Sequence, residues 1–420
     1  MRNFNFVPVL ILLAACAPTA DDSSLTAFVG ATLWDGTGTP PVPGATLVVQ
    51  DGRVLAAGSE VQVPSGATVV DLAGLWIVPG LINTHGHVDG RWASPSTTDD
   101  VARMEEDLLL YARYGVTTVN SLGGGGRPSV VVRDAQEAGT PGRARLHLAG
   151  EVVTGSTAEE AVAAVDRNAA LGADWIKIRV DDNLGTTTKM PPEVYVPVMA
   201  RAREAGIPMA THLFYLDDAK ALLREGTRLV AHSIRDRDVD DEVVSLLKEK
   251  GVCYVPTLVR EVSTFVYAER PGFFDDPFFL RWADRAEMER VSTPAFQAEM
   301  AASPAAAAYR DALAQAQRNL AVLSEAGASV AFGTDSGPAA RFPGYFEHME
   351  MALMAQSGMS AEDILKSATG VAAGCLGLDD VGTLEAGRWA DFLVLDADPM
   401  DDVAALRSLE AVYVGGSRIP

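Results

Sequence analysis

The chain has 420 residues, 48% of them hydrophobic, and a formal net charge of −22. This length allows one large domain with a smaller one beside it, and the composition is that of a globular protein. The negative charge argues against nucleic acid as a partner, because nucleic-acid phosphates would be repelled, and it favours solubility.

The first residues have the pattern of an export signal. A short apolar run over residues 6–13 is too short to span a bilayer as a helix. The following Leu13-Ala-Ala-Cys16 resembles the lipobox of bacterial lipoproteins, in which the cysteine becomes the lipidated N-terminus. We therefore expect a signal peptide over 1–16, lipidation at Cys16 and a tether over 17–25; the alternative is an ordinary cleaved signal peptide. The expected location is the cell envelope, anchored by lipid to the outer membrane and facing the periplasm, or otherwise periplasmic or secreted.

Both flanks of the mature chain are rich in short strands. Residues 26–75 and 383–420 alternate short β-like runs with turn signals such as Gly36-Thr-Gly38. Two β-rich ends that bracket a central domain can pair with each other, so we expect one small β-sandwich from these segments. The main domain then covers residues 76–382.

A repeating signal runs through this main domain. Six times, a helix-like segment ends in a glycine and a short β-branched run follows at once; the glycines are Gly115, Gly172, Gly206, Gly226, Gly251 and Gly327. Glycine after a helix tolerates the left-handed conformation that ends it. The repeat therefore indicates serial βα units and a parallel sheet.

Eight strands are expected, at about 76–84, 116–122, 145–151, 174–180, 207–213, 228–233, 252–258 and 329–335. They are apolar nearly throughout, as strands buried on both faces should be. Eight such units predict an α/β fold of the (β/α)8 TIM-barrel type. A doubly wound open sheet is the alternative, and it is disfavoured because no glycine-rich phosphate fingerprint follows the first strand.

An unusually long excursion at about 260–327 separates the last two expected strands. Its first half is rich in aromatic residues and its second half is alanine-rich, so we expect a helical insertion. Either it is an added helical layer with an aromatic core, or it is a lid that supplies apolar walls to a pocket.

Cys253 and Cys375 are the cysteines that lie beyond the signal sequence. Both stand in apolar stretches of the chain. We expect two buried thiols here rather than a disulfide.

The ends of the expected strands carry polar side chains of a particular kind. Barrel enzymes place their chemistry at the carboxyl ends of the strands. His85 and His87, separated by one residue, point both imidazoles to one side of a strand and make half of a metal site. The complete set at strand ends is His85, His87, Lys177, His212, His232 and Asp335.

This set resembles the amidohydrolase superfamily in its two-metal form with a carboxylated lysine. The resemblance includes Pro79-Gly-Leu-Ile-Asn-Thr-His-Gly-His87 and the closing segment Gly382-Thr-Leu-Glu-Ala-Gly-Arg-Trp-Ala-Asp-Phe-Leu-Val-Leu-Asp396. Within the superfamily the chain is most similar to the imidazolonepropionase-like group, which contains Xaa-Pro dipeptidases. The second-strand end departs from that group, because Asn120-Ser121 stands where relatives often have Arg-Asp.

The resemblance implies two divalent metal ions, with Zn2+ expected, and a CO2-derived carbamate on Lys177. His85, His87, Lys177 and Asp335 would hold one metal, and Lys177, His212 and His232 would hold the other. Asp335 would accept a proton from a water that bridges the metals and deliver it to the leaving amine. Burial in a barrel lowers the pKa of a lysine and frees its amine for reaction with CO2.

Substrate contacts are less specified by the sequence. The candidates are Arg179, Tyr215, Tyr254, Arg260 and His348. Arg179 shares a strand side with Lys177, so it either binds a substrate carboxylate or pairs with Asp181 or Asp182. His348 has either a supporting role at the site or a structural one, and His147 is expected to be structural.

The expected function is hydrolysis of an amide bond, dipeptide-like or non-peptide, in a small molecule. The same site acting on a lactone, ester or cyclic amide is the alternative. A deaminase is disfavoured by Lys177, because that branch usually works with one metal and no bridging lysine. A non-catalytic surface-binding lipoprotein is disfavoured because all six ligand positions are filled. We expect contact with the membrane only through the lipid anchor, and a homo-oligomer is possible.

Overall fold

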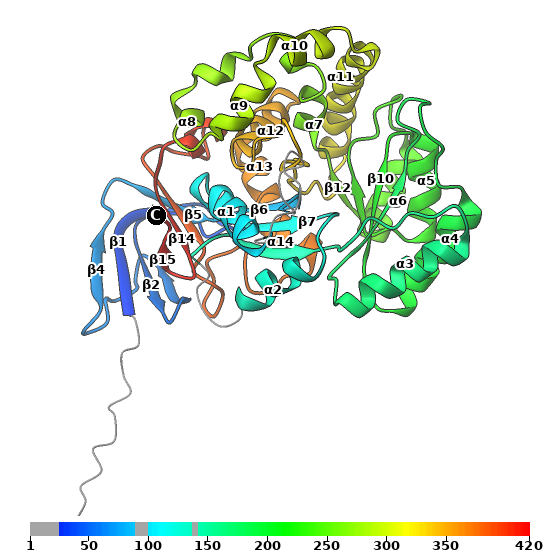
Figure 1. Cartoon of the computed structure of the whole chain (residues 1–420). Coiled ribbons are helices and arrows are strands. Elements are labelled where there is room, and N and C mark those ends of the chain that lie inside the picture. The colour runs from blue at the N-terminus through cyan, green and yellow to red at the C-terminus, as the bar shows by residue number, and fades with distance from the viewer. Residues whose placement is uncertain (1–24, 89–99, 137–141) are drawn as a thin grey trace, which may run out of the picture.

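The computed structural model describes residues 25–88, 100–136 and 142–420 (Figure 1). Cys16, the signal peptide and most of the expected tether lie outside these residues. The strands are β1 (Leu25–Leu33), β2 (Val42–Gln50), β3 (Arg53–Gly58), β4 (Thr68–Asp71), β5 (Trp76–Pro79), β6 (Leu81–Gly86), β7 (Val116–Ser121), β8 (Arg145–Leu148), β9 (Ile176–Val180), β10 (Met209–Leu213), β11 (Leu229–Ala231), β12 (Cys253–Val255), β13 (Phe392–Leu395), β14 (Leu409–Val414) and β15 (Ser417–Arg418).

The α-helices are α1 (Asp100–Arg113), α2 (Arg127–Ala135), α3 (Ala158–Leu171), α4 (Pro192–Glu204), α5 (Leu216–Glu225), α6 (Asp241–Lys250), α7 (Leu258–Val262), α8 (Pro277–Leu280), α9 (Arg285–Val291), α10 (Pro294–Ala301), α11 (Pro304–Glu325), α12 (Tyr345–Gln356), α13 (Ala361–Ser367) and α14 (Gly370–Leu376). Short 3-10 turns are η2 (Val266–Ala268), η3 (Gly272–Asp275) and η4 (Val403–Arg407). None of the helices in the described ranges combines the length and the apolar character needed to cross a membrane.

The two β-rich ends of the chain meet in one sheet. Its strand order is β15-β14-β13-β5-β1-β2-β3, with β4 paired to β1, and the ends join where β5 runs antiparallel to β13. Figure 1 shows this sheet beside the main body, its early strands blue and its late strands red. Phe28 and Phe392 pack edge to face in its core, with ring centroids 5.0 Å apart.

The expected first strand of the main domain is divided at Gly80. β5 belongs to the sheet of the chain ends, whereas β6 pairs with β7 in the main domain. A Cβ at Gly80 would lie 2.1 Å from Oγ1 of Thr117, so only glycine fits at this close approach. The sequence showed one continuous apolar run here because both halves are buried on both faces.

The main domain contains two parallel sheets, β6-β7-β8 and β12-β11-β10-β9, with helices between successive strands. Single parallel bridges connect further segments: Val153 with Ile178, Tyr254 with Val330, and Gly86 with Ser336. The expected strand at 329–335 is therefore not a continuous strand, although its backbone still hydrogen-bonds to both neighbours, for example Ala331 to Tyr254 and Thr84 to Phe332. All six glycines of the helix–glycine–strand repeat have positive φ, which confirms that reading of the repeat.

The segment 260–327 is helical and builds an aromatic cluster. Tyr267, Phe274 and Phe279 are buried there, and they pack with Tyr114 and Phe346 of the main domain. Figure 1 shows α8 to α11 side by side over one end of the main domain. The insertion is therefore a helical layer whose aromatic core is shared with the main domain.

Cys253 and Cys375 form a disulfide, so the expectation of two thiols was wrong. The bond links β12 to α14 across a sequence separation of 122 residues. Both residues lie in one apolar cluster that includes Val255 and Leu376. Their apolar surroundings correctly indicated burial of Cys253, whereas Cys375 is partly buried, and only the folded chain brings the strand and the helix together.

We predict that this disulfide stabilises the fold. Changing both cysteines to alanine should lower the free energy of unfolding by about 2–4 kcal/mol, because the unfolded chain gains freedom in a long loop. Urea unfolding of the variant and of the parent protein checks this, with the reduced parent as the matched control. An unchanged midpoint on reduction and in the variant would contradict it.

Candidate metal centre

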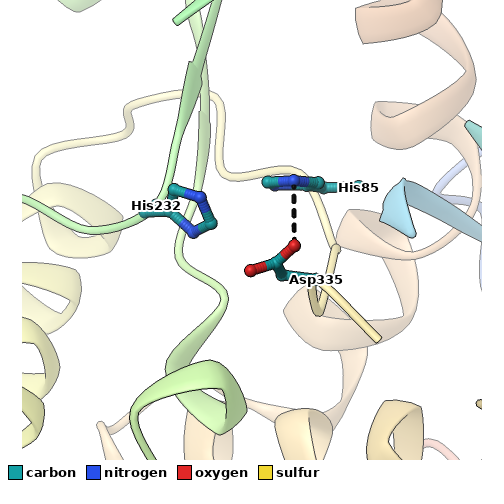
Figure 2. Close-up of side chains that lie close together, drawn as sticks. All are labelled: His85, His232 and Asp335. Carbon is teal, nitrogen blue, oxygen red and sulfur yellow. Dashed lines mark ion pairs between the residues drawn. The ribbon is translucent and has the colours of Figure 1, made fainter. Parts of the chain in front are cut away.

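The six expected ligands line one cavity at the carboxyl ends of the parallel strands. His85 lies near the end of β6 and His87 just after it. Lys177 lies in β9 and His212 in β10. His232 directly follows β11, and Asp335 lies five residues after Val330, which forms the bridge to Tyr254. Figure 2 shows His85, His232 and Asp335 converging from different segments of the chain. One ligand atom from each of these three residues lies within 4.8 Å of the others, close enough to hold a metal ion.

The histidines pack ring against ring around the cavity. The ring centroids of His85 and His232 are 4.7 Å apart, and those of His212 and His232 are 4.2 Å apart. Burial, and after it the charge of Lys177, lowers the pKa of His85 well below its ordinary value. Burial lowers the pKa of His212 to about 3. Neutral imidazoles are the form that ligates metals.

His87 faces Asp335 with the geometry of a metal ligand. Its Nδ1 lies 3.0 Å from the carbonyl oxygen of Gly123, which can only accept, so Nδ1 carries the proton. The lone pair on Nε2 of the neutral ring then faces Oδ1 of Asp335 at 2.8 Å. Two acceptors at this distance repel each other unless a cation or proton lies there, so the pair fits a metal site.

His212 is oriented by a carboxylate that the sequence analysis had not placed in the site. Nε2 of His212 donates to Oδ2 of Asp181 at 2.8 Å, and Asp181 is buried just after β9. This contact leaves Nδ1 of the neutral ring available as a ligand. His232 is oriented in a similar way by Oγ1 of Thr257, 2.8 Å from its Nδ1.

Lys177 is a buried amine without a hydrogen-bond partner. Its Nζ makes no hydrogen bond to any part of the chain that the structure describes. Burial lowers the pKa of Lys177 to about 7, helped by Arg179 and opposed by Asp335. A large fraction of the amine is therefore uncharged at neutral pH, which is the form that reacts with CO2.

Asp335 connects both sides of the site. Its Oδ1 lies 3.4 Å from Nε2 of His85, and its Oδ2 accepts from Nη1 of Arg341 at 2.5 Å. Burial alone would raise the pKa of Asp335, but Arg341, His85 and His87 together hold it well below its ordinary value. The carboxylate is therefore ionised at neutral pH.

Three residues of the site have left-handed backbone conformations. φ is +59° at Asp335, +78° at His232 and +47° at Thr257. Such conformations are strained for residues other than glycine, and they cluster at functional sites. Here they turn the chain at strand ends, so that His232 and Asp335 line the cavity and Thr257 contacts His232.

Two buried glutamates of α12 hold these turns in place. Oε1 of Glu347 accepts hydrogen bonds from Asn83 at 2.7 Å, Thr334 at 2.7 Å and Ser336 at 2.5 Å. Glu350 accepts from the backbone N–H groups of Leu258 and Val259, at 2.8 and 2.7 Å. One helix thereby fixes both the loop of Asp335 and the start of α7.

Of the expected substrate contacts, Arg179 and Arg260 line the cavity. Arg179 lies 3.7 Å from Oδ2 of Asp181, so it makes the first of its expected ion pairs. The other three candidates do not line this cavity, and each has a partner elsewhere; they are Tyr215, Tyr254 and His348. Tyr215 donates to Asp182 at 2.7 Å, Tyr254 accepts from the backbone of Ile234 at 3.0 Å, and His348 bonds the carbonyl oxygen of Tyr114 at 2.8 Å.

The sequence analysis missed Asp181 as a histidine partner, Glu347 as a support and Arg341 as a lining residue. Asp181 follows β9 directly, so its place at a strand end was an available signal. Glu347 precedes the His348 that the sequence singled out. Arg341 lies in a loop, where the sequence has no periodicity to show which way a side chain points. His147 lies in β8 and does not line the cavity.

Comparisons with known proteins agree with this geometry. The model of the amidohydrolase family matches residues 76–419. An uncharacterised protein of Mycobacterium tuberculosis is 25% identical over 394 residues, which cover 91% of this chain and 94% of that protein. The imidazolonepropionase of Deinococcus radiodurans is 25% identical over 400 residues, covering 89% and 92%. A solved structure of a Xaa-Pro dipeptidase with bound methionine superposes with a TM-score of 0.74 at 21% identity, covering 94% of this chain and 99% of that chain, which shows a shared fold.

We predict that Lys177 makes the stability of the metal-free protein depend on pH. Its folded-state pKa of about 7 lies below the ordinary 10.5, so the unfolded chain binds more protons between these values. The free energy of unfolding should therefore rise with pH across this window, by on the order of 1 kcal/mol per unit, and fall as the pH is lowered.

Urea unfolding in metal-free, CO2-depleted buffer between pH 7 and 10 measures this slope. Lys177→Met, which keeps the chain length of the side chain without its charge, is the matched control and should lack this contribution. Equal slopes in the parent and the variant would contradict the prediction.

Proposed function

Because the chain belongs to the amidohydrolase family, we propose that it is a metal-dependent hydrolase that cleaves an amide bond of a small molecule. The residues that would hold the two divalent ions, Zn2+ being expected, are His85, His87, Lys177, His212, His232 and Asp335. Lys177 would take part as a carbamate. The single observation that supports this most strongly is the convergence of all six residues on one cavity.

The donor set fits the proposed ions. The facing atoms of His87 and Asp335 fit a cation or a proton between them, and Nδ1 of His85 is buried without a partner among the described residues. Nζ of Lys177 is equally without a partner, and a carbamate there would turn a donor-only ammonium into two acceptor oxygens. Imidazole and carboxylate groups are ordinary Zn2+ ligands.

The residues of the cavity would have different roles in hydrolysis. Divalent ions, when bound, lower the pKa of a water and polarise the scissile carbonyl. Asp335 is the proton carrier: a carboxylate oxygen accepts a proton from the attacking water and returns it to the nitrogen of the leaving amine. Arg341 holds the other carboxylate oxygen, so Asp335 stays oriented during both transfers. Thr257 and Asp181 keep His232 and His212 in fixed ring orientations.

We further propose that the two parallel sheets close into one (β/α)8 barrel. The three parallel bridges support this, because they connect the segment after β8 to β9, β12 to Val330, and β6 to Ser336. In a closed barrel all carboxyl ends of the strands surround one mouth. That arrangement accounts for the convergence of ligands that are far apart in sequence.

The lipid anchor at Cys16 is a separate proposal. The disulfide between Cys253 and Cys375 supports it, because structural disulfides form mainly in compartments outside the reducing cytosol. Residues 1–16 would direct export, and the mature protein would sit on the cell envelope.

The hydrolase proposal predicts metal and activity together. Purified protein should contain about two divalent ions per chain and hydrolyse members of a panel of N-acyl amino acids, dipeptides and lactones. Elemental analysis and product assays measure both. Lys177→Met should lose metal and turnover together, because the bridging ligand is gone.

Three outcomes separate the possibilities. Hydrolysis of lactones with no hydrolysis of amides would replace the amide proposal with the lactonase alternative. Full metal content and full turnover in Lys177→Met would contradict the role of Lys177. Metal binding without turnover of any compound would contradict the enzymatic proposal.

A further inference from the structure

The loop of residues 337–343, called the Arg341 loop below, lies between two cavities. All of its residues line a cavity of about 560 Å³ that is bounded on its other sides by α1, α8 and α9. Pro338 and Arg341 of the same loop also line the metal cavity. Because open space lies on both sides, packing holds this loop less firmly than a core strand, and hydrogen bonds at particular points have to fix its position.

The Arg341 loop carries the side chain that orients Asp335. Nη1 of Arg341 donates to Oδ2 of Asp335 at 2.5 Å and to the carbonyl oxygen of the same residue at 3.2 Å. At the start of the loop, Gly337 packs so closely on His87 that a Cβ would lie 2.2 Å from the carbonyl oxygen of His87. A movement of this loop would therefore shift the guanidinium relative to Asp335.

Ala340, the residue before Arg341, is the strained point of this loop. Its φ is +65°, a left-handed conformation that residues other than glycine keep only where neighbouring groups hold them in it. Both backbone polar groups of Ala340 are bound by side chains of the helical insertion. The N–H donates to Oε1 of Glu287 in α9 at 2.5 Å, and the carbonyl oxygen accepts from the hydroxyl of Tyr267 in η2 at 2.6 Å.

The insertion residues that bind this loop are themselves held in place. Arg290 donates from Nε to Oε2 of Glu287 and from Nη2 to Oε1, both at 2.7 Å, so the carboxylate has a fixed orientation. The ring of Tyr267 is fully buried in the aromatic cluster of the insertion. Ser263, which directly follows α7, accepts from Nε of Arg341 at 3.2 Å. Three elements of the insertion thus contact two successive residues of the loop.

We propose that Tyr267 and Glu287 are positioning residues for the reaction: by holding Ala340 they keep Arg341 against Asp335. The helical insertion would then fix the orientation of the carboxylate that carries the proton. This inference rests on the proposed function, in which Asp335 moves that proton. Proton transfer requires hydrogen-bond reach, and a displacement of about 1 Å can lower a rate on the order of 100-fold. Loss of either contact should therefore slow turnover while substrate binding stays nearly unchanged.

Three substitutions test this with zinc in excess, on whichever N-acyl amino acid, dipeptide or lactone the parent protein hydrolyses fastest. Tyr267→Phe removes one hydroxyl and keeps the buried ring, and Glu287→Ala removes the acceptor of the Ala340 N–H. Each should lower kcat about 10-fold and leave KM within about twofold. Glu287→Gln keeps an acceptor oxygen for the Ala340 N–H and should recover most of the rate.

Tyr114→Phe is the matched control. The hydroxyl of Tyr114 donates to the carbonyl oxygen of Phe279 at 2.8 Å, within the same aromatic cluster. This bond is of the same kind as the one between Tyr267 and Ala340, but it does not involve the Arg341 loop. The control should therefore keep kcat within about twofold of the parent.

Amide hydrogen exchange resolved to single residues, on metal-loaded and metal-free protein, gives a readout independent of turnover. Tyr267→Phe removes no amide acceptor, so faster exchange in this variant reports a looser loop. Without metal, exchange should be at least about fivefold faster at Ala340, and also at Thr334 and Asp335, whose N–H groups donate to the carbonyl oxygen of His85.

The outcomes separate this inference from the proposed function. If no compound is hydrolysed but the expected exchange pattern is seen, the hold of the insertion on Asp335 stands and the hydrolase proposal fails. Unchanged exchange at Thr334 and Asp335 would overturn the inference. An unchanged kcat in both Tyr267→Phe and Glu287→Ala, or an equal loss of kcat in Tyr114→Phe, would overturn it as well.

Discussion

The site depends on the carboxylate of Asp335, which is shared among partners on opposite sides of the cavity. One oxygen faces His85 and His87, and the other is held by Arg341. The backbone at Asp335 is left-handed, and its N–H donates to the carbonyl oxygen of His85 at 2.6 Å. Side chain and backbone therefore tie the last strand end to the first, and a shift of this loop would separate the ligands.

Buried polar groups beneath the cavity keep that arrangement rigid. Glu347 accepts hydrogen bonds from three side chains beneath the loop of Asp335. Glu350 accepts from the backbone at the start of α7, the helix that contains Arg260. Burial raises the pKa of Glu350 to about 8, so this group is held in place at an energetic cost that its two backbone hydrogen bonds offset in part. Such networks specify one geometry, which a site of several metal ligands requires.

The sequence predicts those features that follow from a periodic pattern, such as the repeated helix–glycine–strand units and the strand ends. Side chains at strand ends converge because parallel strands share one edge, and so the common cavity of His85, Lys177 and His212 could be predicted in advance. The disulfide could not be predicted, because nothing in the sequence between cysteines separated by 122 positions signals that they approach each other. Tyr254 was misplaced because strand residues alternate: its neighbours Cys253 and Val255 belong to one apolar cluster and Tyr254 to another. Arg341 lies in a loop, where no periodicity orients a side chain.

The central claim is that six convergent side chains form a two-metal centre bridged by a modified lysine. X-ray diffraction from crystals of the purified protein, with data collected on both sides of the zinc absorption edge, tests this most directly. The account predicts two anomalous peaks, one beside His85 and His87 and one beside His212 and His232, with density for a carbamate extending from Lys177 between them. Fully occupied metal sites around an unmodified Lys177, or no anomalous peak in this cavity, would contradict it.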